Sequence, residues 1–234
     1  MKIIINADDF GSSEKVNRAI YTSAKDNYIS SATIMSIAPC LDEAVEMTKE
    51  LKHISFGVHL TFDDKFPSLS GKPKYFDKND IVNIKGLNLL KLNIICNEFS
   101  MQIEKLLEKG INISHLDTHQ HIHLYPLVAL AVSIVSKKYN INKTRSVRIF
   151  AKKSIVNKSY RFLHYSFMNI RGNTQPAYYT NFPMFIDENI YNKESNDIIE
   201  IMCHPGSTFN DEEYFNESIY TTQLKDSLIN YHNL

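Results

Sequence analysis

The sequence has few of the residues that mark a secreted, disulfide-stabilised protein. Its 234 residues include no tryptophan and only three cysteines, Cys40, Cys96 and Cys203. An odd number of cysteines without CxxC spacing argues against a disulfide framework and is typical of a reduced compartment. We therefore expect a cytoplasmic protein.

The sequence also lacks an excess of charge and a long apolar run. Lys plus Arg is 26 and Asp plus Glu is 26, so the formal net charge is zero. This balance excludes a generally basic protein, the class that binds nucleic acid or anionic membranes through overall charge. The apolar run at residues 3–5 is far shorter than a signal-peptide core or a membrane span. We expect neither nucleic acid nor a membrane as partner.

Short apolar, β-branched segments alternate with segments of helical spacing along the chain. The pattern predicts strands at residues 2–6, 31–37, 54–60, 111–117, 146–150 and 198–203. It predicts helices at about residues 12–26, 41–51, 92–107, 126–135 and 155–168, and a further helical stretch from residue 211. Residues 171–185 are expected to be irregular.

This alternation predicts an α/β fold with parallel strands, in one domain over residues 1–234. The polar segment of residues 61–85 contains Pro67, Gly71 and Pro73 and is expected to be a long loop on that domain. Acidic residues and histidines follow several of the predicted strands, which is where (β/α) barrels assemble their sites. An irregular (β/α) barrel is therefore favoured over an open sheet.

Histidines gather in one short stretch, with His115, Asp117, His119, His121 and His123 at alternate positions. In a strand, alternate positions share one face, so the first three would project together until the strand ends. The stretch could be a run of exposed or structurally hydrogen-bonded histidines. Its clustering favours a metal site.

Four chemically reactive positions fall at the ends of separate predicted strands. Asp8-Asp9, His59, His119 and His204 could converge at one end of a barrel. Each position alone also fits a structural role, since paired acids can form a helix cap and a single histidine can be satisfied in the core.

His204 follows an apolar strand and precedes a Pro-Gly turn. A histidine held there suits an acid that protonates a leaving group near neutral pH. Cys203 could be proposed as a nucleophile, but adjacent strand residues point to opposite faces, so we expect a core cysteine.

These segments together resemble a known family. The motifs that carry the resemblance are, in order, Asn6-Ala7-Asp8-Asp9-Phe10-Gly11, Gly57-Val58-His59-Leu60, the stretch from His115 to His123 with Tyr125-Pro126, and Met202-Cys203-His204-Pro205-Gly206. They are similar to the motifs of the YdjC/ChbG-like carbohydrate deacetylases. The resemblance implies an irregular (β/α) barrel akin to polysaccharide deacetylases, a divalent metal usually taken as magnesium, and a homodimer. It implies removal of acetyl groups from N-acetylated sugars such as chitooligosaccharides.

Carried over position by position, the resemblance makes Asp9, His59 and His119 the metal ligands. It makes Asp8 the base and His204 the acid. Two further positions, Asp117 and Arg148, would then orient these groups.

The required chemistry agrees with these residue types. A divalent cation polarises an amide carbonyl and lowers the pKa of a bound water from about 15.7 toward 7. Two histidines and one carboxylate also suit zinc, and they are the ligand set of non-haem iron oxygenases. The alternative enzymes are therefore another metal-dependent hydrolase or an iron oxygenase. A catalytically silent sugar-binding protein is a further alternative, because residues 216–224 lack the arginine that members of the similar family commonly carry in this tail.

Overall fold

We describe the protein from a computed structural model of the chain. It describes residues 1–62, 68–70, 89–149, 155–188, 190, 196–209, 211–216 and 224–234. Most of the loop predicted at residues 61–85 lies outside the described residues, as does residue 150 of the predicted strand 146–150.

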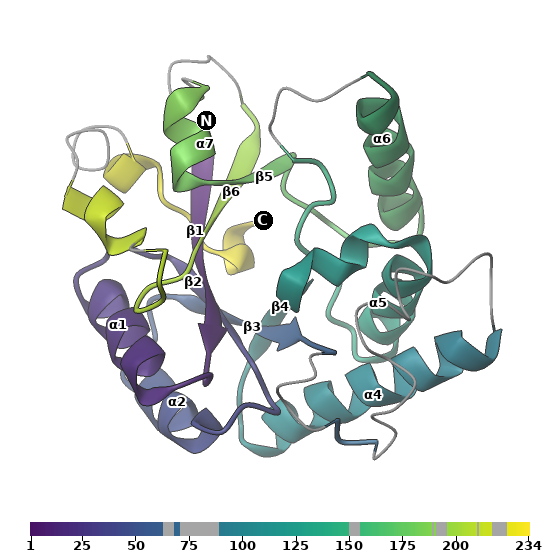
Figure 1. Ribbon diagram of the computed structural model, residues 1–234, viewed down its shortest axis with the longest axis horizontal. Coiled ribbons are helices and arrows are strands. Elements are labelled where there is room, and N and C mark those ends of the chain that lie inside the picture. Colours follow the sequence, from purple (N-terminus) through teal and green to yellow (C-terminus); the bar gives the residue numbers. More distant parts are fainter. Residues whose placement is uncertain are drawn as a thin grey trace.

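Six parallel strands form one sheet in the order β4-β3-β2-β1-β6-β5. They are β1 (Lys2–Phe10), β2 (Ser31–Ile34), β3 (Ser55–Leu60), β4 (Ile113–Thr118), β5 (Tyr178–Asn181) and β6 (Ile198–Cys203). Figure 1 shows the sheet curled into a half-barrel with helices outside it. This confirms the predicted α/β barrel class.

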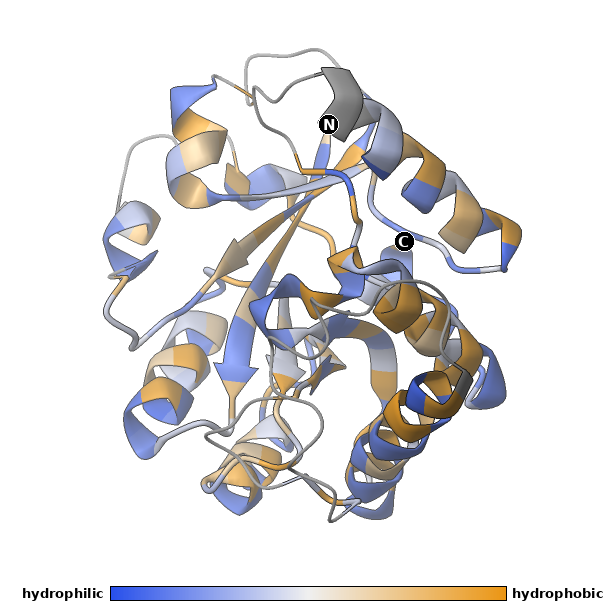
Figure 2. Cartoon of the chain, turned by 45° about the vertical axis from the view of Figure 1, so that its right-hand side comes forward, coloured by the Kyte–Doolittle hydropathy of each residue, from blue (hydrophilic) through white to orange (hydrophobic). Residues whose placement is uncertain are grey.

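The helices that cover the sheet follow the apolar spacing of the sequence. They are α1 (Glu14–Lys25), α2 (Leu41–Thr48), α4 (Leu89–Glu108), α5 (Pro126–Lys138), α6 (Ile155–Ile170) and α7 (Phe182–Asp187). Ser13 caps α1 by accepting a hydrogen bond from the Val16 amide, and Pro126 starts α5. Figure 2 shows the central strands largely hydrophobic and the outer helices of mixed character. Among the described helices, none is both long and apolar enough to cross a membrane.

The segment after α5 spans the open side of the half-barrel. Thr144 forms an isolated bridge with Leu116 of β4, and Ile149 forms one with Tyr179 of β5. The predicted strand at residues 146–150 is thus only a bridge within the described residues. Its position carries Arg145 into the interior of the sheet.

The C-terminal segment enters the barrel from the amino ends of the strands. Leu228 bridges Ile3 at the start of β1, and the Ile229 amide donates to the Ile3 carbonyl at 2.9 Å. The C-terminus accordingly lies near the centre of the molecule in Figure 1. The described residues beyond 211 form short 3-10 turns, η4 (Asp211–Asn216), η6 (Lys225–Ser227) and η7 (Tyr231–Asn233), where a helix was predicted.

Two further differences from the predicted elements bear on the site. Strand β1 continues through Asp8 and Asp9 to Phe10, because its pairing with β2 resumes at Phe10 opposite Ile34 after a register shift. Residues 178–181 form β5 within the segment that was expected to be irregular, since pairing with β6 outweighs their polar composition.

Candidate metal centre and active site

Asp9, His59 and His119 come together at the carboxyl ends of β1, β3 and β4. Asp9 Oδ1 lies 3.3 Å from His59 Nε2 and 3.0 Å from His119 Nδ1. The two ring nitrogens, His59 Nε2 and His119 Nδ1, are 3.3 Å apart. The positions expected to converge therefore do so.

The local backbone positions each of these three side chains. Asp9 has a φ of 68° at the point where the β1 register shifts between Ala7 and Phe10. This left-handed conformation is uncommon outside glycine and lets two adjacent carboxylates, Asp8 and Asp9, serve one site. His119 follows the last residue of β4 and starts η2 (His119–Leu124).

The spacing of the three atoms fits a shared divalent cation. Bonds of about 2.0–2.2 Å to one ion place neighbouring nitrogen and oxygen ligands roughly 3.0–3.5 Å apart. The three separations of 3.0–3.3 Å lie within this range. Side chains are 20% exposed for His119, 23% for Asp9 and 2% for His59, so one side of the cluster is open.

A second acidic grouping, Asp8, His59 and Asp117, is fully buried. It is a poorer cation site because the Arg145 guanidinium already bonds both of its carboxylates, at 2.8 Å to Asp117 Oδ2 and 2.6 Å to Asp8 Oδ1. Asp117 also lies 2.7 Å from His59 Nδ1. This contact orients the ring so that Nε2 faces Asp9.

The charges around these groups determine their protonation. Burial alone would raise the pKa of Asp8, but Arg145 outweighs it and holds the pKa below its usual range. Burial likewise opposes ionisation of Asp9, whose pKa is lowered by hydrogen bonds from His119 and His59. Both carboxylates are therefore ionised at neutral pH.

Asp8 lies directly beside the cluster and is held from several sides. Arg145 bonds both oxygens of Asp8, with Nη1 at 2.8 Å from Oδ2 and Nη2 at 2.6 Å from Oδ1. The Asn6 side chain donates to Asp8 Oδ1 at 2.9 Å. These contacts hold the Asp8 carboxylate in one orientation.

His204 lies on the other side of Asp8, after the end of β6. Its Nε2 is 3.9 Å from Asp8 Oδ2, and its Nδ1 is 3.5 Å from Asp211 Oδ2. Asp211 also accepts the His204 amide at 2.7 Å. Burial lowers the pKa of His204, but the Asp211 hydrogen bond and the carboxylates of Asp8 and Asp9 raise it above the ordinary value.

Arg148 has no contact with the acidic groups among the described residues, so the orienting role expected for it stays a prediction. Its guanidinium lies over the ring of Tyr178, 4.1 Å from the centroid, and donates to that tyrosine's hydroxyl at 2.5 Å. Arg145, three residues earlier, makes contacts with these groups. The bridge between Thr144 and β4 turns Arg145 into the barrel interior, where it is 1% exposed.

Three side chains that contact the candidate site residues, directly or through Arg145, escaped the sequence analysis, namely Arg145, Glu200 and Asp211. Glu200 is fully buried in the middle of β6 and accepts from Arg145 Nε at 2.8 Å. The sequence did offer one signal for Glu200. A carboxylate between two isoleucines in a buried strand requires a buried cation or hydrogen-bond donor as its partner. Burial raises the pKa of Glu200 to about 6, against the opposing effect of Arg145.

The other histidines of the 115–123 stretch do not join the cluster. His115 stacks on Tyr231 with ring centroids 3.6 Å apart, and His123 Nδ1 lies 2.6 Å from Thr118 Oγ1. His121 packs against Tyr179. Burial lowers the pKa of His121 to about 3, so it is neutral at physiological pH. Cys203 is fully buried, as expected for a core cysteine.

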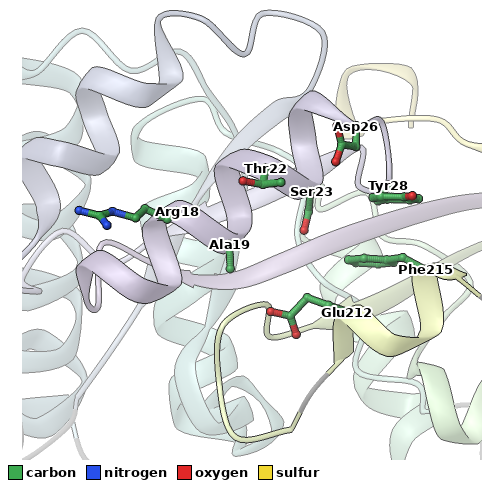
Figure 3. Close-up of a pocket in the computed structure, with 8 residues that line it drawn as sticks. All are labelled: Arg18, Ala19, Thr22, Ser23, Asp26, Tyr28, Glu212 and Phe215. Atoms are coloured by element: carbon green, nitrogen blue, oxygen red, sulfur yellow. The ribbon is translucent and has the colours of Figure 1, made fainter.

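A pocket of about 350 Å³ lies between α1 and η4, away from the metal cluster (Figure 3). Its lining residues are Arg18, Ala19, Thr22, Ser23, Asp26, Tyr28, Glu212 and Phe215. The Tyr28 and Phe215 rings stack at its wall, 5.0 Å apart. The pocket contains none of the residues that converge on Asp9, so we do not place the reaction there.

Comparison with known proteins identifies relatives of this chain. A carbohydrate deacetylase of Vibrio cholerae serotype O1 (strain ATCC 39541) is 30% identical over 209 residues, covering 88% of this chain and 78% of that protein. A carbohydrate deacetylase of Clostridium beijerinckii is 31% identical over 216 residues, covering 88% of this chain and 82% of that protein.

The fold has a solved counterpart in a protein of Enterococcus faecalis V583, described as a candidate for cellobiose-phosphate cleavage. The TM-score is 0.76 at 21% identity, with 99% of this chain and 98% of that chain covered. This likeness supports the fold alone. Residues 2–232 match the family model described as YdjC-like protein. The chain therefore belongs to the YdjC-like protein family.

Proposed function

We propose that this protein is a metal-dependent hydrolase that removes N-acetyl groups from small N-acetylated sugars such as chitooligosaccharides. The observation that carries the proposal is the cluster of Asp9, His59 and His119, with Asp8 beside it and His204 across from Asp8. The carbohydrate deacetylases among the relatives support the substrate class. Residues 1–234 would act as one catalytic domain.

Asp9, His59 and His119 would hold the cation, which we propose is Mg²⁺, with Zn²⁺ as the alternative for two imidazoles and a carboxylate. When bound, such an ion polarises the amide carbonyl and acidifies a water molecule. The Asp117–His59 contact of 2.7 Å would hold the His59 ring with Nε2 directed toward the ion.

Asp8 is the proposed base. Its carboxylate is ionised and fixed by Arg145, and it would accept the proton of the attacking water at the oxygen nearest the open side of the cluster. The bidentate contact keeps this oxygen in one place during the reaction. The full positive charge of Arg145 also compensates the negative charge of Asp8 while the amide is attacked.

His204 is the proposed acid. Its raised pKa favours the imidazolium form near neutral pH, so a proton is available at Nε2 for the departing sugar amine. Asp211 accepts the His204 amide and lies 3.5 Å from Nδ1, which fixes the ring with Nε2 toward Asp8. His204 Nε2 and Asp8 Oδ2 are 3.9 Å apart, so the proposed acid and base lie side by side next to the cluster.

The proposal is tested by measuring acetate release from N,N′-diacetylchitobiose by protein supplied with Mg²⁺ or Zn²⁺, with a chelator-treated sample as control. We expect acetate to be released in a fixed ratio to the sugar consumed. The release should stop when chelator removes the metal and resume when metal is added back. Binding of the sugar without acetate release would indicate a silent binding protein instead. Turnover that requires oxygen and a 2-oxo acid would indicate an oxygenase.

A further inference from the structure

The C-terminal segment is joined to the base by a continuous chain of buried hydrogen bonds. Tyr231 in η7 is fully buried, and its hydroxyl donates to Glu200 Oε2 at 2.6 Å. The other oxygen of Glu200 accepts from Arg145, which bonds both oxygens of Asp8. Three successive contacts therefore connect Tyr231 with Asp8, and these two residues lie at opposite ends of the barrel.

Tyr231 is itself held tightly in place. Its ring stacks on His115 at 3.6 Å and an interplanar angle of 5°, and its amide donates to Ser55 Oγ at 3.1 Å. The Lys143 ammonium donates to the Tyr231 carbonyl at 2.6 Å. The ring of His115 occupies the space that a Cβ at Gly57 would fill, with ring atoms 2.5–2.7 Å from that position. Tyr231 thus has one orientation.

The balance of charge explains why the tyrosine hydroxyl matters. One guanidinium, that of Arg145, contacts three carboxylates, those of Asp8, Asp117 and Glu200. A buried carboxylate oxygen without a donor is costly, and Glu200 Oε2 would compete for Arg145. The Tyr231 hydroxyl satisfies that oxygen without adding a charge, so that Arg145 stays in its bidentate contact with Asp8.

We infer that Tyr231 is a positioning residue of the reaction, which sets the orientation of Asp8 through Glu200 and Arg145. The inference rests on the proposed function for its catalytic consequence. It makes the C-terminal segment a part of the active site's support, and it gives a role to a tyrosine that never touches substrate.

The test compares Tyr231→Phe with Tyr21→Phe in the full chain. Phenylalanine keeps the stacked ring and removes only the hydroxyl. Tyr21 is the matched control because its hydroxyl donates to Glu50 Oε2 at 2.6 Å on the exposed surface. We expect Tyr231→Phe to lower kcat for acetate release about tenfold, with KM and metal affinity within about twofold of wild type. The control should retain wild-type kinetics.

A second measurement follows the Arg145 side chain without relying on activity. The Nε–H of Arg145, hydrogen-bonded and buried, should give a slowly exchanging NMR signal that is absent in Arg145→Lys. We expect Tyr231→Phe to shift this signal and accelerate its exchange, and Tyr21→Phe to leave it unchanged. If Tyr231→Phe does not fold, Glu200→Gln removes the charge of the acceptor that joins Tyr231 to Arg145, and it should lower kcat and shift the signal in the same direction.

The outcomes separate the inference from the proposed function. If the wild type releases no acetate, the proposed function fails, and the Arg145 signal still decides whether Tyr231 positions the guanidinium. A wild-type kcat in folded Tyr231→Phe overturns the inference, as does an unchanged Arg145 signal.

Discussion

Asp8 and Asp9 are neighbours in the sequence with different surroundings. Asp8 is 1% exposed and bonded on both oxygens by Arg145, whereas Asp9 Oδ1 faces the ring nitrogens of His59 and His119. A left-handed φ at Asp9 turns the two carboxylates to these separate partners. The geometry therefore supports different roles for the two aspartates, base for Asp8 and ligand for Asp9.

Replacing the base should abolish turnover without removing the metal. We expect Asp8→Asn to lower kcat by about 10²–10⁴-fold, because the amide cannot accept the water's proton. Metal content, measured by elemental analysis of the purified variant, should stay at the wild-type level. Loss of metal in Asp8→Asn together with retention in Asp9→Asn would show that the two roles are exchanged.

The two arginines of the segment after α5, Arg145 and Arg148, offer a matched pair. Arg145→Lys cannot reproduce the bidentate bond to Asp8 while also reaching Glu200, so kcat should fall roughly 10- to 100-fold. Arg148→Lys alters a stacked, partly exposed side chain on Tyr178 and should change kcat less than about threefold. Steady-state kinetics of both variants check this. Equal losses would contradict the role given to Arg145.

His164 on α6 predicts a specific sensitivity to acid. It is 7% exposed, and burial, followed by the charge of Arg161, lowers its pKa from 6.5 to about 4. A group whose pKa is depressed in the folded state contributes stability above its unfolded pKa, and that stability is lost as pH falls below about 6.5. Between pH 7.5 and 5, His164 should cost the folded state about 2 kcal/mol.

Urea unfolding at both pH values tests this directly. The unfolding free energy of both proteins is measured at pH 7.5 and at pH 5. We expect its decrease between the two pH values to be about 2 kcal/mol smaller in His164→Phe than in wild type. Equal losses in the two proteins would mean that His164 is protonated in the folded state as readily as in the unfolded chain.

At the scale of elements, the close packing of β3 against β4 depends on one glycine. Gly57 in β3 leaves room for the His115 ring of β4, which in turn supports Tyr231. A methyl group at Gly57 would collide with that ring. This contact gives a packing reason for the glycine that stands two residues before the proposed ligand His59.

We expect Gly57→Ala to destabilise the protein by about 1–3 kcal/mol, because neither the strand nor the stacked ring has free space. In a His115→Ala background the same substitution should cost less, since the ring is gone. A double-mutant cycle of unfolding free energies measures the difference. Additive effects would show that Gly57 and His115 do not compete for space.

The sequence predicted the apolar elements well and the polar ones poorly. The predicted strand at residues 198–203 matches β6, and the helical spacing from residue 92 lies within α4, because burial of apolar side chains decides both. Strand β5 was missed, since Tyr178–Asn181 carries no apolar run and is fixed by pairing with β6. The region after residue 211 has helical composition but forms 3-10 turns in its described parts.

The residues of the candidate site were likewise predictable only where they follow an apolar strand. Asp9, His59 and His119 could be selected because each stands near the end of an apolar strand. Sequence spacing could not select Arg145 over Arg148, because the irregular bridge at Thr144 decides which side chain faces inward. Tyr231 carried no sequence signal, since its function depends on where the chain's last segment returns to the barrel.

At the scale of the whole molecule, the curled sheet collects side chains from distant segments at one end. Ligand candidates come from residues 9, 59 and 119, the proposed base is residue 8 and the proposed acid is residue 204. The bridging segment after α5 adds Arg145, and the C-terminal segment adds Tyr231. The predicted homodimer and cytoplasmic location stay predictions, as does the Mg²⁺ preference.

The central claim is that Asp9, His59 and His119 share one divalent cation. Its most direct test is an equilibrium titration of metal-free protein with Zn²⁺ and Mg²⁺, comparing wild type, Asp8→Asn and Asp9→Asn. We expect one equivalent bound by wild type and Asp8→Asn, and at least 100-fold weaker binding by Asp9→Asn, because a first ligand is lost. Absence of stoichiometric binding by folded wild type, or unchanged affinity in Asp9→Asn, would contradict the account.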